Sequence, residues 1–311
     1  MNKMQSMKEN IERVMIGQEE TIELLLVAIL AEGHVLIEDM PGTGKTVLSS
    51  SLAKTIEGKF NRIQFTPDLL PSDVTGLNYY NQKLGEFVFR EGPAFCNILL
   101  ADELNRATPR TQSSLLECMA ERQITIDGET RKLEKPFMVI ATQNPLETLG
   151  TYPLPEAQLD RFLMRIQMTN PSKETDLGIL KRFLLEEPLA DLRSICNMKE
   201  MNQYIQEARE IMVHPLLLEY IADLANASRE DGRIEVGISP RGSLALLRAV
   251  RAYAYLQKRT YVVPEDVKKL AIPVLAHRIK LTGGFVPIVD QSSAIERLLQ
   301  TVPIATEEWE L

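Results

Sequence analysis

The segment Pro41–Thr46 (PGTGKT) constrains the fold of this chain more than any other part of its sequence. It lies between a short apolar run, His34–Glu38, and a segment with a helical pattern, Val47–Ile56. A glycine-rich turn between a strand and a helix lets backbone N–H groups surround phosphate oxygens, and the helix N-terminus adds a partial positive charge. The segment therefore predicts a phosphate-binding loop, in which Lys45 contacts the outer phosphates and the Thr46 hydroxyl holds Mg²⁺.

One position departs from the usual G-x-x-x-x-G-K-[ST] pattern, because Asp39 stands where the first glycine is expected. Asp39 belongs to the entrance of the loop, away from the later amides that surround the phosphates. The alternative is a turn that contains G-T-G-K-T by chance. The preceding strand pattern and the following helix pattern favour the phosphate loop.

Further apolar runs follow in the first half of the chain, and each leads into a turn or a helical pattern. They are Arg62–Thr66, Asn97–Ala101, Phe137–Thr142 and Phe162–Met168. This alternation is typical of a parallel sheet with helices between its strands. Two stretches interrupt it and predict inserted β-hairpins: Leu77–Gly92, and Arg122–Lys135 with an Asp127-Gly128 pair suited to a type I′ turn.

Beyond residue 170 the pattern changes to helical periodicity. The predicted helices are Glu200–Met212, Leu216–Arg229, Ser243–Gln257 and Pro264–His277. A chain of 311 residues suits about two domains. We therefore expect an α/β domain over residues 1–170 and an all-α domain over residues 171–311.

Polar groups that suit phosphate chemistry stand at the ends of two of the predicted strands. Asp102 and Glu103 follow the run in "CNILLADELNRA", and Asn144 follows the run in "MVIATQNP". A strand-end carboxylate can hold Mg²⁺, its neighbour can polarise an attacking water, and an amide can orient that water. The alternatives are acids that are merely solvated and a turn-forming Asn-Pro pair. The upstream phosphate loop in the same domain favours the catalytic interpretation.

Three arginines are candidates for neutralising charge on a transferred phosphoryl group. Arg161 and Arg165 lie four residues apart in "AQLDRFLMRI", and Arg241 opens a predicted helix in "GISPRGSLALL". For each of them the alternative is a solvated or salt-bridged surface residue.

Composition narrows the functional classes. The formal net charge of −8 argues against a mainly electrostatic grip on nucleic acid or on an anionic membrane. The longest apolar stretch, Ile22–Ala31, is too short to cross a bilayer, so we expect no membrane insertion. The three cysteines match no zinc or redox spacing, which favours a reducing compartment and a cytoplasmic location. His34, His214 and His277 share no metal-ligand spacing.

Taken together, the motifs resemble those of the MoxR-type AAA+ ATPases. The segments that carry the resemblance are "MPGTGKT", "FTPDLLPSDVTG", "ILLADELNRA", "ATQNP", "LPEAQLDRF", "ISPRGSLALLRA" and "VVPEDVKKLAIPVLAHRI". The resemblance extends from about Ile11 to Ile279, and an acidic residue before the Pro-Gly pair, such as Asp39, is usual in that family. It implies a parallel-sheet P-loop AAA+ α/β domain with inserted β-hairpins, followed by an all-α lid domain.

The resemblance also implies a role for each site residue. ATP and Mg²⁺ would be held by the Walker A loop and its surroundings, with Thr46 and Asp102 on the metal. Glu103 would activate water, Asn144 would be sensor 1, and Arg241 would be sensor 2. Arg161 would be the arginine finger that acts on a neighbouring subunit's ATP, with Arg165 as the lesser candidate. The implied nucleotide-contacting residues are Ile16, Gly17, Pro41, Gly42, Thr43, Gly44, Lys45, Thr46, Val47, Asp102 and Arg241.

A finger supplied by a neighbour implies a homo-oligomeric ring, with a hexamer as the expected size. The family resemblance further implies chaperone-like maturation of protein substrates or metal-cofactor insertion, alongside a partner with a von Willebrand factor A domain.

Two other functions are compatible with a nucleotide site. The first is an AAA+ motor acting on DNA, which would need basic or aromatic hairpin tips. The first hairpin has aromatic residues, but the basic residues of the second, Arg131, Lys132 and Lys135, are balanced by Asp127, Glu129 and Glu134. The second is a small-molecule kinase, which would need an acceptor pocket and no separate helical domain carrying Arg241.

Overall fold

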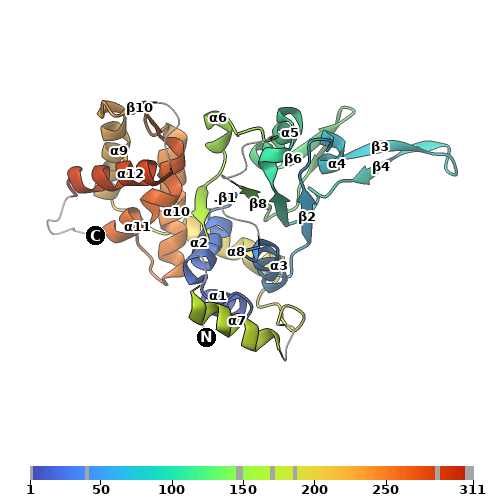
Figure 1. Ribbon diagram of the computed structural model, residues 1–311, viewed down its shortest axis with the longest axis horizontal. Coiled ribbons are helices and arrows are strands. Elements are labelled where there is room, and N and C mark those ends of the chain that lie inside the picture. Colours follow the sequence, from blue (N-terminus) through green and yellow to red (C-terminus); the bar gives the residue numbers. More distant parts are fainter. Residues whose placement is uncertain are drawn as a thin grey trace. The chain divides into compact units, whose positions relative to one another are not determined.

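The computed structural model describes residues 3–38, 42–144, 150–168, 172–184, 188–283 and 288–304 (Figure 1). The chain forms two compact units. Unit 1 comprises Met1–Leu25, His34–Leu154 and Ile166–Asn202, and unit 2 comprises Leu26–Gly33, Pro155–Arg165 and Gln203–Leu311. Each unit is therefore built from three separate pieces of the sequence.

A five-stranded sheet has the strand order β2-β5-β8-β1-β9. Its strands are β1 (Val35–Glu38), β2 (Phe60–Gln64), β5 (Ile98–Asp102), β8 (Met138–Gln143) and β9 (Met164–Gln167). The pairs β1–β8, β2–β5 and β5–β8 are parallel. Strand β1 is buried along its whole length, as are the first four residues of β5. Continuous burial is typical of parallel strands covered on both faces, which is why these strands appear in the sequence as unbroken apolar runs.

Several helices and one 3₁₀ turn belong to unit 1. Those that lie wholly in unit 1 are α1 (Lys3–Glu12), α3 (Lys45–Thr55), α4 (Pro71–Thr75), α5 (Pro109–Glu121), α7 (Lys173–Phe183) and the 3₁₀ turn η1 (Leu104–Arg106). Helices α2 (Glu19–Leu30) and α8 (Met198–Arg209) belong partly to each unit. Helix α3 packs on β2, β5 and α1, with Leu48 and Leu52 fully buried. The helix that follows the phosphate loop is thereby fixed to the sheet.

Both predicted hairpins form in unit 1. They are β3 (Gly76–Asn81) with β4 (Glu86–Glu91), and β6 (Gln123–Ile126) with β7 (Glu129–Lys132). The backbone φ angles of Asp127 and Gly128 are 51° and 84°, and a type I′ turn requires both to be positive. The β3–β4 hairpin extends away from the sheet of its own unit as a long two-stranded ribbon (Figure 1).

Unit 2 is mainly helical. Its helices are α6 (Glu156–Leu159), α9 (Pro215–Glu230), α10 (Pro240–Leu256), α11 (Pro264–Leu275), the 3₁₀ turn η2 (Ala276–Arg278) and α12 (Ile288–Thr301). Proline stands at the start of α9, α10 and α11, where its missing N–H costs nothing. The Ser239 hydroxyl caps α10 by accepting a hydrogen bond from the Gly242 amide at 3.1 Å.

The expected parallel α/β sheet with inserted β-hairpins and the mainly helical second unit are present, and one detail of the sequence prediction is wrong. The helical unit is not purely α, because β10 (Ile234–Val236) pairs antiparallel with β11 (Lys280–Leu281). These strands are three and two residues long. Such short segments are below the length at which an alternating apolar pattern can be recognised.

In the part of the chain that the structure describes, none of the helices combines the length and apolar character that crossing a bilayer demands.

Candidate active site

The phosphate loop leads from the end of β1 into α3. Gly42 and Gly44 have φ angles of 92° and 89°, in the left-handed region that glycine tolerates. Gly44 is the N-cap of α3 and has no side chain to occupy the first-turn N–H groups, which are therefore left for a ligand. A Cβ atom added at Gly42 would meet nothing within 4 Å. This combination is an open cradle at a helix N-terminus, suited to a phosphate group.

Lys45 and Thr46 form the first turn of α3, and Val47 follows them in the same helix. Thr43, in the loop itself, lies with its hydroxyl 3.6 Å from the sulfur of Met168. Two of the residues singled out in the sequence, Asp39 and Pro41, lie outside the described residues.

Asp102 ends β5 and is held by neighbouring strands. Its Oδ1 accepts a hydrogen bond from the Thr142 hydroxyl at 2.7 Å, and its Oδ2 pairs with Arg62 Nη2 at 2.7 Å. Thr142 is on β8 and Arg62 is on β2, the two strands on either side of β5. The same Thr142 oxygen accepts a hydrogen bond from the Glu103 amide at 2.8 Å. The hydroxyl of Thr142 therefore fixes the position of both the Asp102 carboxylate and the Glu103 backbone amide.

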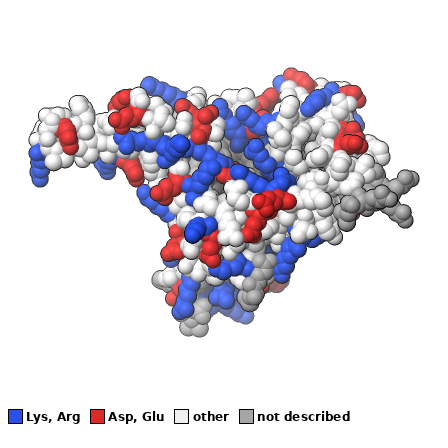
Figure 2. Space-filling model, turned by 180° about the vertical axis from the view of Figure 1, so that it is seen from behind, with Lys and Arg blue, Asp and Glu red and all other residues white. Residues whose placement is uncertain are grey.

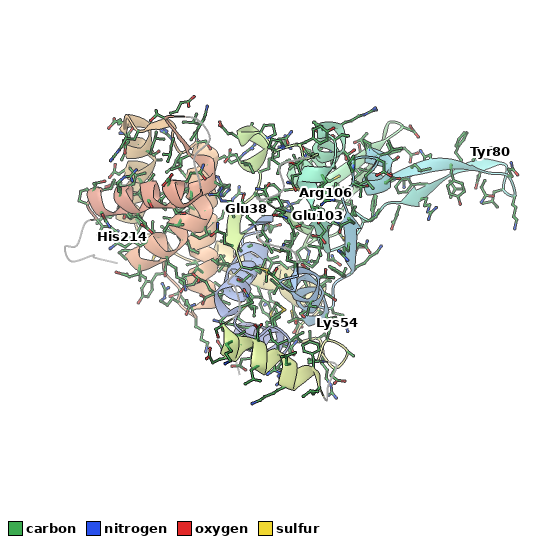
Figure 3. All side chains as sticks on the ribbon, viewed as in Figure 1. Glu38, Lys54, Tyr80, Glu103, Arg106 and His214 are labelled. Atoms are coloured by element: carbon green, nitrogen blue, oxygen red, sulfur yellow. The ribbon has the colours of Figure 1, made fainter. Side chains whose placement is uncertain are left out.

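Glu103 follows β5 with a φ angle of 55°, an unusual value for a residue other than glycine. Its Oε2 accepts a hydrogen bond from Gln64 Nε2 at 2.7 Å and lies 3.0 Å from Arg106 Nε. The Glu103 and Arg106 side chains lie close together at the edge of the sheet (Figure 3). Side-chain exposures of 29% for Glu103 and 39% for Arg106 leave this pair accessible to water. A strained backbone that presents a water-accessible carboxylate is a common feature of catalytic positions.

The sheet order brings these groups to one edge. Strands β5, β8 and β1 are adjacent and parallel, so their carboxyl ends meet at the same side of the sheet. β5 ends in Asp102, β8 is followed by Asn144, and β1 leads into the phosphate loop. In open α/β sheets this edge is where ligands bind.

The segment that contains Ile16 and Gly17 borders the loop within unit 1. The side chain of Met15, the preceding residue, reaches Gly44: its Cε would lie 3.2 Å from a Cβ added there. Gly17 has a φ of 73°, and a Cβ at that position would approach Thr175 of α7 to 2.8 Å. The structure thus places this segment between the phosphate loop and α7.

The three candidate arginines belong to unit 2. Arg161 is exposed and follows α6. Arg165 is half-buried and its Nη2 donates to Gln291 Oε1 at 2.8 Å. Arg241 is 61% exposed at its side chain, with its Nη1 3.9 Å from Asp160 Oδ2.

Sequence reasoning missed Thr142, Gln64, Arg62 and Arg106. Each is a polar residue within or just beyond an apolar strand run, and that position is the signal that marks them. The partners of Thr142, Gln64 and Arg62 come from or directly follow other strands, so these contacts required the sheet order, whereas Arg106 pairs locally with Glu103.

The residues present fit ATP with Mg²⁺. Hard oxygen donors from the Thr46 hydroxyl and the Asp102 carboxylate suit Mg²⁺, which uses few protein ligands together with substrate phosphates. Within the described ranges there is no group of three or more His, Cys, Asp and Glu side chains that could hold a metal by itself. A Mg²⁺ site that uses one or two protein oxygens together with substrate phosphates does not need such a group.

Comparison with known proteins gives the same picture. Residues 34–164 match the model of the ATPase family associated with various cellular activities (AAA), and residues 226–298 match the AAA lid domain. The protein YeaC of Bacillus subtilis, described as uncharacterized, is 48% identical over 88% of this chain and 85% of its own length. Chaperone MoxR1 of Mycobacterium tuberculosis is 40% identical over 94% of this chain and 80% of its own. Protein MoxR of Paracoccus denitrificans is 32% identical over 94% and 93%. A crystal structure of a Cytophaga hutchinsonii protein superposes with a TM-score of 0.90 at 39% identity, covering 98% of this chain and 96% of that one.

The chain therefore contains an ATPase domain of the AAA+ class, and the enzyme hydrolyses ATP. Within that class, the chain belongs to the MoxR-type AAA+ ATPase family, as its motifs predicted.

Proposed function

We propose that this enzyme works as a homo-oligomeric ring, with six subunits as the expected number, that uses ATP hydrolysis for chaperone-like remodelling or maturation of partner proteins. Metal-cofactor insertion is included in that activity. A partner with a von Willebrand factor A domain and a cytoplasmic location are part of the proposal. The Mycobacterium tuberculosis relative is named Chaperone MoxR1, and this name supports the chaperone-like part of the proposal.

The observation that carries the proposal is the exposed apolar ribbon β3–β4 on the ATPase unit. Large apolar side chains of this hairpin are exposed: Leu77, Tyr79, Tyr80, Leu84 and Phe87, at 40–73%. Tyr80 lies toward the far end of the ribbon (Figure 3), and uncharged atoms cover most of the ribbon's surface in Figure 2. Exposed apolar patches of this kind mark protein interaction sites.

The second hairpin supports the base of the first. Asn78 on β3 donates to Asp127 in the β6–β7 turn at 2.7 Å, and the guanidinium carbon of Arg131 lies 4.1 Å from the centre of the Phe89 ring. Arg131 also pairs with Glu129 at 2.6 Å. These contacts occupy Arg131, one of the basic groups that a DNA motor would need for phosphates, and together with the apolar ribbon this favours a protein substrate over the DNA alternative.

The proposed mechanism of ATP hydrolysis uses the loop before α3 and the polar groups at the ends of β5 and β8. In our proposal the amides of Gly42, Thr43 and Gly44, with Lys45, bind the phosphates of ATP, and Thr46 and Asp102 hold Mg²⁺, which supplies charge neutralisation. Ile16, Gly17, Pro41 and Val47 complete the nucleotide contacts. Glu103 accepts the proton of the attacking water, and Asn144 orients that water.

Arginines complete the proposed site. Arg161 acts as the finger on the ATP of a neighbouring subunit, and Arg241 responds to the nucleotide of its own subunit. Arg165 is the lesser candidate for the finger because its guanidinium is already bonded to Gln291.

The test is phosphate release from an equimolar mixture of Glu103→Gln and Arg161→Ala proteins, each also assayed alone. Each variant alone is expected to be nearly inactive, since one lacks the base and the other the finger. A mixed ring pairs an intact Glu103 with an intact Arg161 of its neighbour and recovers activity. Absence of recovery, with subunit exchange demonstrated by a labelled-subunit assay, would mean that Arg161 does not act between subunits.

A further inference from the structure

The segment that carries Arg161 is clamped by one buried arginine of unit 2. Arg278 ends η2, and its side chain is only 2% exposed. Its Nε donates to Asp160 Oδ1 at 2.8 Å, and its Nη2 donates to the Phe162 carbonyl at 2.6 Å. These two partners are the residues immediately before and after Arg161. The clamp therefore fixes the backbone on both sides of the proposed finger.

Further contacts make the clamp rigid. Arg278 Nη1 donates to the Leu163 carbonyl at 3.1 Å, and a ring nitrogen of His277 lies 3.2 Å from the Phe162 carbonyl. Gly242 of α10 leaves room for the guanidinium stem, because a Cβ at that position would lie 3.0 Å from Arg278 Cδ. Burial lowers the pKa of Arg278 to about 10, so the guanidinium stays charged at neutral pH opposite Asp160.

Asp160 has a second set of partners at the start of α10. Its Oδ2 accepts a hydrogen bond from the Ser239 hydroxyl at 3.3 Å and lies 3.9 Å from Arg241 Nη1. One carboxylate is thus shared between the buried Arg278 and the exposed Arg241. Asp160 also directly precedes Arg161 in the chain. The proposed sensor arginine therefore contacts the side chain of the residue that directly precedes the proposed finger.

We propose that Asp160 and Arg278 are positioning residues that hold Arg161 in the orientation needed to act on a neighbouring subunit's ATP, with Asp160 linking that orientation to Arg241. This inference rests on the proposed function, since it takes Arg161 to be the finger. A guanidinium displaced by about 1 Å from its working position can lower a rate by about 100-fold, so small losses of clamp geometry are measurable.

The test uses Asp160→Asn, which keeps the size of the side chain and an acceptor for Arg278 but removes the charge. We expect kcat to fall between about 10- and 100-fold, with the KM for ATP changed less than about twofold, because only a transition-state contact is misplaced. The matched control is Glu156→Gln. Glu156 is another carboxylate of the same segment, 59% exposed and 3.9 Å from Lys280, and its replacement is expected to leave the rate unchanged.

Mixing experiments separate positioning of the finger from other roles. An Asp160→Asn subunit has an intact Glu103 but a displaced finger, so a Glu103→Gln neighbour supplies the good finger it needs. In a randomly mixed head-to-tail ring about half of the Asp160→Asn subunits have such a neighbour, so their phosphate release should rise toward about half of the wild-type rate per subunit. A local folding defect in unit 2 would not be corrected by a neighbour in this way.

Two parallel mixtures distinguish the possible failures. If Arg161→Ala is rescued by Glu103→Gln but Asp160→Asn is not, the positioning inference is overturned while the proposed function stands. If neither is rescued, the finger assignment fails and the inference fails with it.

Two further variants extend the test. Arg241→Ala, which would act within its own subunit, should not be rescued. Arg278→Lys provides a second variant: it keeps the charge and loses the forked contacts to the Phe162 and Leu163 carbonyls, and it should show the same rescue.

Discussion

Two arginine–carboxylate clusters of this enzyme have similar distances and opposite environments. At the strand edge of unit 1, Glu103 lies 3.0 Å from Arg106, and both side chains are more than a quarter exposed. In unit 2, Asp160 lies 2.8 Å from Arg278, whose side chain is 2% exposed. Exposed pairs contribute little to stability and exchange partners at small cost, whereas removing one member of a buried pair leaves an uncompensated charge. The two carboxylates are similarly exposed, at 29% for Glu103 and 20% for Asp160, so the burial of the arginine partner is what separates the two clusters.

This difference matches the proposed roles. A general base must leave its hydrogen-bond partners to take a proton from water, and Glu103 has two partners that solvent can replace. A clamp must keep its partners throughout the cycle. The buried Arg278 has several partner groups, which include the Asp160 carboxylate and the carbonyls of Phe162, Leu163 and Val274.

The largest expected effect comes from Glu103→Gln. An amide cannot accept the proton of the attacking water, so kcat should fall by roughly 1000-fold, while ATP binding is retained. Phosphate release and binding of a fluorescent ATP analogue measure the two quantities separately. Glu121→Gln, at the exposed end of α5, is the matched control. A loss of binding equal to the loss of rate would contradict a role confined to the chemical step.

Arg278→Met tests the buried cluster directly. It should lower the free energy of unfolding of unit 2 by about 3–5 kcal/mol, because Asp160 and the freed carbonyls lose a buried charged partner. The equivalent change at the exposed Asp102 partner, Arg62→Met, should cost about 1 kcal/mol or less. Urea unfolding of both variants, followed by circular dichroism, makes the comparison. Equal destabilisation by the two changes would remove burial as the explanation.

A buried histidine of unit 1 extends the comparison to pH. His34 Nδ1 accepts a hydrogen bond from the Val139 amide at 3.0 Å, and its Nε2 lies 3.0 Å from the Met119 carbonyl. Burial lowers its pKa from 6.5 to about 4. The unfolded chain therefore binds the proton more readily, so this stability is present above pH 6.5 and is lost as the pH falls toward 4.

The loss expected from His34 is about 3 kcal/mol between pH 7 and pH 4, since each unit of pKa shift corresponds to about 1.4 kcal/mol. Unfolding free energies measured across this range for the wild type and for His34→Gln give the test. The variant is expected to be less stable at pH 7 and to have a shallower pH dependence. Identical slopes would show that His34 binds protons equally in the folded and unfolded chains, so that its pKa is not lowered in the folded protein.

Much of the fold was predictable because its signals are local. The apolar runs that overlap β1, β2, β5, β8 and β9, the two hairpins, and the periodic helices of the second half each depend on neighbouring residues in the sequence. The short ladder β10–β11 was not predictable, since its pairing joins segments about 45 residues apart through strands of two and three residues.

The residues of the candidate site also divide into those with a local sequence signal and those whose contacts depend on distant parts of the chain. The loop and Asp102, Glu103 and Asn144 follow strand runs, so they could be proposed from sequence. Thr142 and Gln64 were missed, because their importance depends on which strands flank β5. Arg278 was missed for a further reason: its partner Asp160 lies 118 residues earlier, and nothing in the local pattern marks an arginine as buried.

The smallest effect separates two roles for Gln64, whose side-chain amide donates to Glu103. Gln64→Leu should raise the rate of ATP hydrolysis by about two- to fivefold, because an exposed hydrogen bond that restrains Glu103 contributes about 0.5–1 kcal/mol. The change should have no effect in a Glu103→Gln background. Gln5→Leu removes a similar exposed bond, from Gln5 to Glu9 at 3.0 Å on α1, and should leave the rate unchanged. A fall in rate would mean that Gln64 orients Glu103 toward the attacking water. The exposed Glu103 cluster would then hold a fixed geometry for catalysis, as the Asp160–Arg278 cluster is proposed to do. The two clusters would then differ only in their contribution to stability.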